Sequence, residues 1–262
     1  MITVKLFGGM GNQLWQRAYG LALESRGYDV VFDKSWFSEE EARRYSFFEY
    51  SLGIFGDLRF GAIQERFIHE RDLTRYDSSM LQPPEGSTLV GYWQSEHYFE
   101  DISDKVRRAF TFPALSFRYA ALHQDISSSN SVSVHIRRKG FIDFLEFHGV
   151  LAVDYYTAAI ERIRATNADA QFYVFADASD RPWCREFLPK DLRIVDGTDK
   201  YEDMYLTAAC KHAITANSSF SFWGAWLGDE KPNRIVIAPK KMFTAPTMAN
   251  DADMVPARWI RL

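Results

Sequence analysis

Residues 2–33, ITVKLFGGMGNQLWQRAYGLALESRGYDVVFD, give the clearest indication of the fold class. Residues 2–7 alternate and are rich in β-forming side chains, which predicts a strand. The GGMG run at 8–11 breaks that pattern, and apolar residues then recur at helical spacing over residues 12–26. Residues 29–33 (DVVFD) predict a second strand. A strand, a glycine turn, a helix and a strand are the opening of a Rossmann-like unit.

The second half of the chain repeats this alternation. A polar, serine-rich run at 123–130 (HQDISSSN) predicts a linker. After it, strands are expected at 132–136, 172–176, 192–195, 213–216 and 234–238, and helices at 154–166, 201–212 and 218–227. Such alternation predicts parallel sheets with helices on both faces. We therefore expect an α/β protein with two Rossmann-like domains, residues 1–125 and 126–262, that face a central cleft.

The composition excludes several classes of protein. The chain has 262 residues, of which 47% are apolar, so it can bury a core and is not disordered. Its net charge is −4 without a clustered basic surplus, which argues against nucleic-acid binding. Cys184 and Cys210 do not form a disulfide framework, and no signal peptide or membrane-spanning stretch is evident. A soluble cytoplasmic protein is expected.

The glycine turn of the first domain is a candidate ligand site. In such sheets, ligands bind at the carboxyl ends of the strands. Gly9 and Gly11 would let the backbone approach a ligand, and the amide of Asn12 would read sugar hydroxyl groups. The alternative is a tight turn without a ligand.

A pair of arginines follows the predicted strand at 132–136. The run His135-Ile136-Arg137-Arg138 places two guanidinium groups at the end of that strand, where they suit phosphate oxygens. A solvated pair at the start of a loop is the alternative.

Two further strand ends carry polar side chains. Asn217 can cap the helix predicted at 218–227, and Ser218 and Ser219 would offer hydroxyl and N–H groups to an anion at its positive end. An ordinary helix cap is the alternative. Asp177 could accept hydrogen bonds from a guanine or a ribose, although a turn aspartate is the commoner case.

Metal signals are weak. No two histidines have the spacing of a zinc site. Asp251-Ala252-Asp253 is formally a DxD motif, but it lies in a polar stretch close to the carboxyl terminus, so we predict no metal site.

Seven runs, in order over nearly the whole chain, resemble the bacterial α-1,2-fucosyltransferases of glycosyltransferase family 11. They are GGMGNQLWQRAYG at 8–20, GYWQSEHYFED at 91–101, HIRR at 135–138, HGVLAVDYY at 148–156, FADAS at 175–179, YEDMYLTAACKHAITANSSFSFWGAW at 201–226 and RIVIAPKKMF at 234–243. The resemblance implies a GT-B fold and metal-independent, inverting transfer of fucose from GDP-β-L-fucose to the 2-hydroxyl of a galactoside. It also implies a role in glycan or surface-polysaccharide synthesis, with a peripheral membrane association through a lipid-linked acceptor.

The resemblance also implies roles for single residues. Arg137 would hold the donor β-phosphate with support from Arg138, and His135 would line the nucleotide. The remaining donor contacts would come from the diphosphate-binding Asn217, Ser218 and Ser219, from Asp177 near the nucleoside, and from Asn12 facing the transferred sugar.

One position departs from the family pattern HxRRxD. Gly140 stands where the aspartate is expected, and Asp143 follows three residues later as a substitute. This departure leaves the catalytic base open between Asp143, Glu146, His148 and Glu96.

Three other functions compete with this prediction. A related transferase with another acceptor or linkage has the same build. A nicotinamide-dependent dehydrogenase is suggested by Gly9-Met10-Gly11 with Asp29 about 20 residues on, although Leu14 stands at the third glycine position. The missing aspartate suggests a non-catalytic carbohydrate-binding protein.

Overall fold

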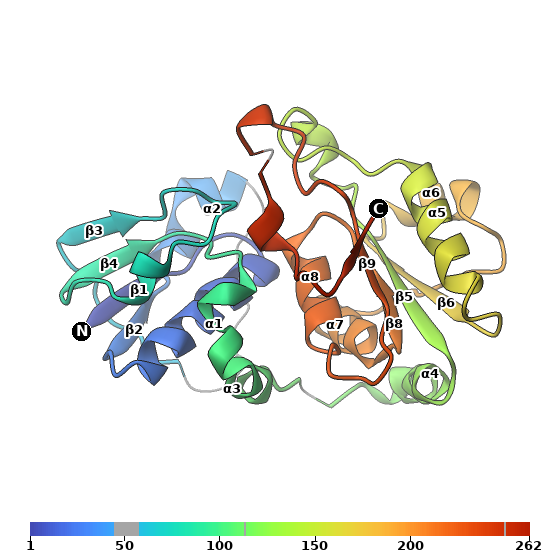
Figure 1. Ribbon diagram of the computed structural model, residues 1–262, viewed down its shortest axis with the longest axis horizontal. Helices are drawn as coiled ribbons and strands as arrows, with labels where there is room; N and C mark the ends of the chain where they lie inside the picture. Colours follow the sequence, from blue (N-terminus) through green and yellow to red (C-terminus); the bar gives the residue numbers. More distant parts are fainter. Residues whose placement is uncertain (45–57, 113, 249) are drawn as a thin grey trace. The chain divides into compact units, whose positions relative to one another are not determined.

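The computed structural model describes residues 1–44, 58–112, 114–248 and 250–262 (Figure 1). The chain forms two compact units, composed of residues 1–112 with 252–254 and of residues 113–251 with 255–262. Each unit is built around a parallel sheet, which confirms the α/β class.

The N-terminal unit contains a four-stranded parallel sheet in the order β2-β1-β4-β3. Its strands are β1 Ile2–Lys5, β2 Val30–Asp33, β3 Arg66–His69 and β4 Ser87–Val90, and its helices are α1 Met10–Ser25, α2 Glu40–Arg44 and α3 Ser103–Ala109. Helix α1 buries Leu14 and Ala18, and it ends where Gly27 adopts a φ of +89°. The amides of Gly27 and Tyr28 then bond back to the carbonyls of Glu24 and Leu23, which satisfies the last turn. The predicted strand–turn–helix–strand opening is confirmed.

The C-terminal unit contains a six-stranded parallel sheet in the order β10-β9-β8-β5-β6-β7. Its strands are β5 Ser131–Ile136, β6 Gln171–Ala176, β7 Arg193–Ile194, β8 His212–Ile214, β9 Val236–Ala238 and β10 Ile260–Arg261. Its helices are α4 Phe117–Ser128, α5 Val153–Arg164, α6 Arg181–Phe187, α7 Lys200–Ala209 and α8 Ser219–Trp226.

Strand β6 separates the two halves of the core of this unit. Phe172 and Val174 pack on the side of α5 and α6, whereas Tyr173 and Phe175 pack on the side of α4 and α7. Helices therefore cover both faces of the sheet, as Figure 1 shows. Burying each such side chain contributes about 1.5–3 kcal/mol, so this sheet forms a rigid platform for the loops at its carboxyl edge.

The predicted linker at 123–130 is wrong. Most of it belongs to helix α4, which packs Tyr119, Leu122 and Ile126 against the sheet. The C-terminal unit begins at residue 113, not at 126. Serine suits loops and caps, but here the three apolar side chains at helical spacing outweigh it.

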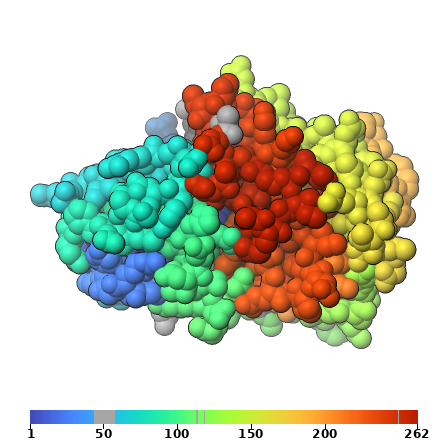
Figure 2. All heavy atoms as spheres, in the orientation of Figure 1, coloured from blue at the N-terminus to red at the C-terminus, as the bar shows by residue number. Residues whose placement is uncertain are grey.

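The sequence also missed the last strand of the C-terminal unit. Strand β10 pairs in parallel with β9, and the terminal segment that leads to it, red in Figure 2, covers a broad part of this unit's surface in that view. Two residues of irregular pattern give no periodic signal. No helix among the residues that the structure describes is long and apolar enough to cross a membrane.

Candidate active site

The carboxyl ends of β5 and β6 bring two of the predicted residues into contact. These strands are neighbours in register, with Ile136 opposite Ala176, so the residues that follow them meet at one edge. Nη1 of Arg137 donates a hydrogen bond to Oδ2 of Asp177 over 2.8 Å. About a third of each side chain is exposed, 33% and 34%. The pair is therefore within reach of a ligand at the sheet edge.

Arg138 takes a different direction. Its guanidinium carbon lies 4.3 Å from the ring centre of Trp183 in α6, a cation–π arrangement. The backbone amides of Arg138 and Lys139 both donate to Oδ2 of Asp180, each over 3.0 Å. Asp180 is almost fully buried and was not predicted from the sequence. It fixes the turn that carries Arg137.

Asn217 has a different role from the predicted helix cap. Its Nδ2 donates to the carbonyl oxygens of His148 at 2.8 Å, Met242 at 3.2 Å and Gly149 at 3.4 Å. The N-cap of α8 is Ser218, whose side chain makes no capping hydrogen bond. The cap prediction for Asn217 is therefore wrong. Asn217 instead ties the loop after β5 to the start of α8.

Two histidines join these loops through aromatic contacts. His135 stacks on Phe220 of α8 with ring centres 5.2 Å apart, and His148 stacks on Phe141 at 4.3 Å. The guanidinium carbon of Arg137 lies 5.5 Å from the ring centre of Phe141. The residues predicted at 135, 137, 148, 177 and 217–219 thus gather at one edge of the sheet.

Burial keeps both histidines neutral. Burial, together with a smaller effect of the positive charge of Arg137, lowers the pKa of His135 to about 3 and that of His148 to about 4. At neutral pH the positive charge beside these rings is therefore that of Arg137. A neutral imidazole does not compete with it for an anion.

We expect this neutrality to make the protein acid-sensitive. Both pKa values lie below the ordinary histidine value of 6.5, so the unfolded chain binds more protons as the pH falls below 6.5. For each histidine, the free energy of unfolding then falls by at most about 1.4 kcal/mol per unit of decreasing pH, until the pH reaches the pKa of that histidine in the folded protein. Chemical denaturation at pH 7, 6 and 5 would measure this loss. A His135→Gln variant that shows the same pH dependence as the parent would contradict the assignment for His135.

The acidic candidates for the catalytic base lie on an exposed turn. Asp143 and Glu146 are exposed, and among the described residues neither forms an ion pair with Arg137. Gly140 has a φ of +77°, and a Cβ added there would lie 3.7 Å from Nη2 of Arg137. An aspartate at this position would therefore place its carboxylate beside Arg137. In this chain Asp177, not Asp143, pairs with that arginine.

The glycine turn of the N-terminal unit differs in detail from the prediction. Gly9 is the N-cap of α1 and Gly11 is buried in its first turn, whereas Gly8 adopts the left-handed φ of +75°. Oδ1 of Asn12 accepts a hydrogen bond from Nε2 of Gln94 over 2.9 Å. Gln94 was not predicted, because the sequence does not show that it lies beside Asn12. The fourth base candidate, Glu96, belongs to this unit.

The DxD motif does not form a pair of open carboxylates. Asp251 accepts from the amide of Met242 over 2.6 Å and pairs with Arg261 over 2.7 Å. Asp253 pairs with Arg75 over 3.1 Å. Within the described ranges no cluster of three or more His, Cys, Asp or Glu side chains could hold a metal ion. Metal independence itself stays a prediction.

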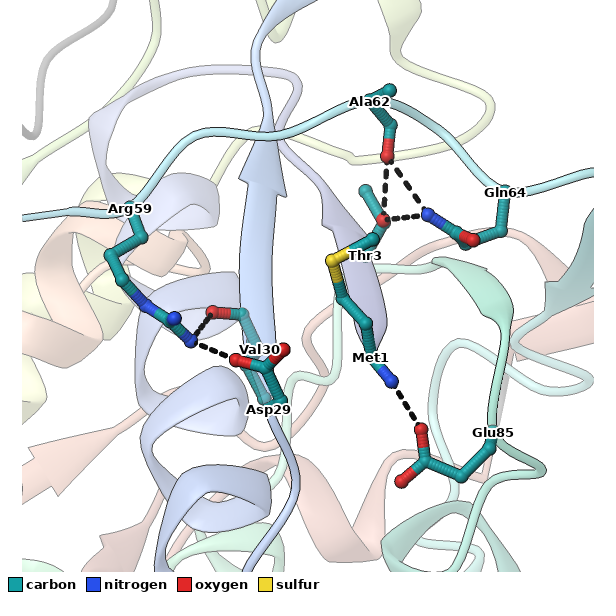
Figure 3. Close-up of polar contacts among 8 residues, drawn as sticks. All are labelled: Met1, Thr3, Asp29, Val30, Arg59, Ala62, Gln64 and Glu85. Atoms are coloured by element: carbon teal, nitrogen blue, oxygen red, sulfur yellow. Dashed lines mark hydrogen bonds and ion pairs between the residues drawn. The ribbon is translucent and has the colours of Figure 1, made fainter.

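Asp29, the acid on which the dehydrogenase alternative rests, lies at the wrong end of its strand. Asp29 precedes β2 and pairs with Arg59, as Figure 3 shows. It therefore lies at the amino end of the strand, whereas the glycine turn follows the carboxyl end of β1, which runs parallel to β2. The acid that binds a dinucleotide ribose must lie on the side of the glycine turn.

A family model described as glycosyl transferase family 11 matches residues 69–262. The chain belongs to this family. An α-1,2-colitosyltransferase of Escherichia coli is 30% identical over 100% of this chain and 99% of its own length. The O-antigen biosynthesis glycosyltransferase WbnK of Escherichia coli is 26% identical over 98% of this chain and 99% of its own. Galactoside α-(1,2)-fucosyltransferase 2 of Oryctolagus cuniculus is 24% identical over 99% of this chain and 79% of its own length.

Among solved structures, the NodZ α-1,6-fucosyltransferase soaked with GDP-fucose superposes with a TM-score of 0.51. It is 18% identical, and the match covers 86% of this chain and 92% of NodZ. This likeness bears on the fold, which is of the GT-B type. Membership of a glycosyltransferase family excludes the dehydrogenase alternative.

Proposed function

We propose that this family 11 chain transfers L-fucose from GDP-β-L-fucose to the 2-hydroxyl of a galactoside, with inversion to an α-linkage. The observation that carries the proposal is the position of Arg137 at the carboxyl edge of the sheet, beside Asp177 and next to the loop that Asn217 ties to the start of α8. The name of the Oryctolagus cuniculus relative supports fucose, a galactoside acceptor and the 1,2-linkage, and the name of the colitosyltransferase supports the α-1,2-linkage.

Arg137 would stabilise the leaving group. Cleavage of the sugar–phosphate bond builds negative charge on GDP, and fixed donors must balance it. The guanidinium group of Arg137 would exchange part of its contact with Asp177 for a phosphate oxygen. Ser218 and Ser219 would add N–H and hydroxyl donors at the positive end of α8.

The acceptor hydroxyl would attack the sugar carbon from the face opposite GDP. A base close to its proton would assist. The pKa of His148, about 4, makes its ring a weak base. Asp143, Glu146 and Glu96 stay candidates, and comparing the turnover of single alanine variants would rank them.

We expect transfer to proceed without a divalent ion, because Arg137 and the start of α8 supply the positive potential that a metal provides elsewhere. Rates measured in excess EDTA and in excess Mg²⁺ should agree within about twofold. Removing a group that stabilises the leaving group would lower the rate far more than this. A loss of activity in EDTA that Mg²⁺ restores would refute this part of the proposal.

Colitosyl transfer is a second candidate. It is favoured by the relative named as an α-1,2-colitosyltransferase, which is similar over the whole chain. Colitose is fucose without its 3-hydroxyl, so the two donors differ by one polar group.

The decisive experiment incubates the protein with lactose and either GDP-fucose or GDP-colitose, and determines the product linkage by NMR. An α-1,2-fucosylated product formed at the higher kcat/KM supports the proposal. Preference for GDP-colitose would replace it with the second candidate. Another linkage would support the related-transferase alternative.

A further inference from the structure

A pair of side-chain amides lies at the carboxyl edge of the N-terminal sheet. Asn12 belongs to the first turn of α1, and Gln94 follows β4. Nε2 of Gln94 donates to Oδ1 of Asn12 over 2.9 Å, and both residues are half-buried. Strands β1 and β4 are parallel neighbours, which brings their two loops together.

This pair retains one donor group and one acceptor. Among the described residues, neither Nδ2 of Asn12 nor Oε1 of Gln94 has a hydrogen-bond partner. Reversing both amides would exchange their roles and leave the same combination. A sugar hydroxyl both donates and accepts, so one hydroxyl or a neighbouring pair of them would satisfy both groups.

The loop that presents Gln94 is held in a rare conformation. Trp93 has a φ of +56°, a left-handed value that bulky residues seldom adopt. The Glu70 carboxylate, just after β3, accepts hydrogen bonds from the amide of Tyr92 at 2.7 Å and from that of Trp93 at 3.1 Å. Backbone strain of this kind persists only where the surroundings enforce it, and it concentrates at functional sites.

Further contacts fix the same loop. The indole of Trp93 stacks on Tyr19 with ring centres 4.2 Å apart. Nε2 of Gln16 donates to the carbonyl of Gly91 over 3.2 Å, while its Oε1 accepts from the amide of Phe7. Gln16, which belongs to α1 together with Asn12, thus joins this loop to the end of the segment before the glycine turn. The loop is rigid at the point where it presents Gln94.

Two aromatic side chains lie close to the amide pair in sequence. Phe7 ends the segment before the glycine turn, and its ring lies 4.7 Å from that of Tyr92. Both side chains are half-buried. Sugar sites in proteins combine a few placed polar groups with aromatic walls of this kind.

We propose that Asn12 and Gln94 bind hydroxyl groups of a pyranose, and that Glu70 is a positioning residue that holds the Gln94 loop in its binding conformation. The proposal rests on the proposed fucosyl transfer for the nature of the sugar. Two sources have the required chemistry, the transferred sugar of the donor and the galactoside acceptor.

The test compares Gln94→Ala and Asn12→Ala with the parent enzyme. We expect each variant to weaken sugar recognition about tenfold, as the loss of a neutral hydrogen bond does, with GDP binding unchanged within about twofold. A higher KM for lactose in the variants would show that the amide pair binds the acceptor. GDP-fucose should bind the parent more tightly than GDP does, and a smaller difference between these two affinities in the variants would show that the pair binds the sugar of the donor. A matched control is Gln64→Ala, which removes an amide that bonds to Thr3 and Ala62 in the same unit (Figure 3).

Glu70→Gln tests the positioning role. The variant should raise the same sugar KM or dissociation constant as Gln94→Ala while leaving GDP binding intact. If Glu70 acts through Gln94, the double variant Glu70→Gln/Gln94→Ala should have a sugar KM or dissociation constant less than about twofold above that of Gln94→Ala alone. Independent, multiplicative effects would assign Glu70 a merely structural role and overturn that part of the proposal. Should Glu70→Gln fail to fold, Glu70→Asp takes its place in the cycle.

Direct binding separates this proposal from the proposed function. Saturation-transfer NMR with lactose and with L-fucose requires no turnover. If the parent protein forms no fucosylated product but binds either sugar, and Gln94→Ala abolishes that binding, the proposed function fails and the subsite stands. Unchanged sugar recognition in folded Gln94→Ala and Asn12→Ala, or no binding of either sugar to the parent, would overturn the subsite.

Discussion

Arg137→Ala should lower kcat/KM for sugar transfer by about 10²–10³-fold, the usual effect of removing one transition-state donor. Arg137 is the cation that the structure places between the end of β5 and the loop anchored on Asn217. Its ion pair with Asp177 is about one third exposed, so losing it should cost less than about 1 kcal/mol of stability. Initial-rate kinetics together with thermal unfolding would separate the two effects.

Arg138→Ala is the matched control for this prediction. It removes a neighbouring guanidinium group that stacks on Trp183, whereas the guanidinium group of Arg137 bonds to Asp177. We expect a loss below about tenfold, because the guanidinium group of Arg138 is engaged by Trp183 and such a cation–π contact contributes only about 0.5–2 kcal/mol. Equal losses in the two variants, or near-normal turnover in Arg137→Ala, would contradict the assignment of Arg137.

The sequence predicted this part of the site because its signals are local. A buried strand followed by charged residues places Arg137 at a sheet edge, and Asp177 does the same one strand along. Parallel register then brings them together without further information. The apolar helix after Ser218 was equally clear from its own residues.

The residues that were missed act through contacts that no local pattern contains. Glu70, Gln94 and Asp180 each bond to backbone or side chains of another loop. Asn217 was misread for the same reason, since its three carbonyl partners lie 25 to 69 residues away. The linker error has another cause, because the serine-rich run masked the helical spacing of Leu122 and Ile126 in α4.

Asp180→Ala should have the second large effect, on both stability and rate. Oδ2 of Asp180 is the acceptor for the amides of Arg138 and Lys139, and the side chain is almost fully buried. Arg138 is half-buried and Lys139 is exposed, so water can replace part of what is lost, and the variant should lower the stability by about 1–3 kcal/mol. The turn that carries Arg137 would then move, and a shift of about 1 Å can lower a rate about 10²-fold.

Asp180→Asn distinguishes hydrogen bonding from charge in this turn. The amide oxygen of asparagine can accept from both N–H groups, so this variant should retain a melting temperature and a kcat/KM close to those of the parent. Thermal unfolding and initial rates measured on the parent and both variants provide the comparison. If Asp180→Asn is as damaging as Asp180→Ala, the negative charge matters and the two hydrogen bonds do not explain the role of Asp180. If Asp180→Ala retains full stability and rate, the turn does not depend on this carboxylate, and Arg137 is held in place by its contacts with Asp177 and Phe141.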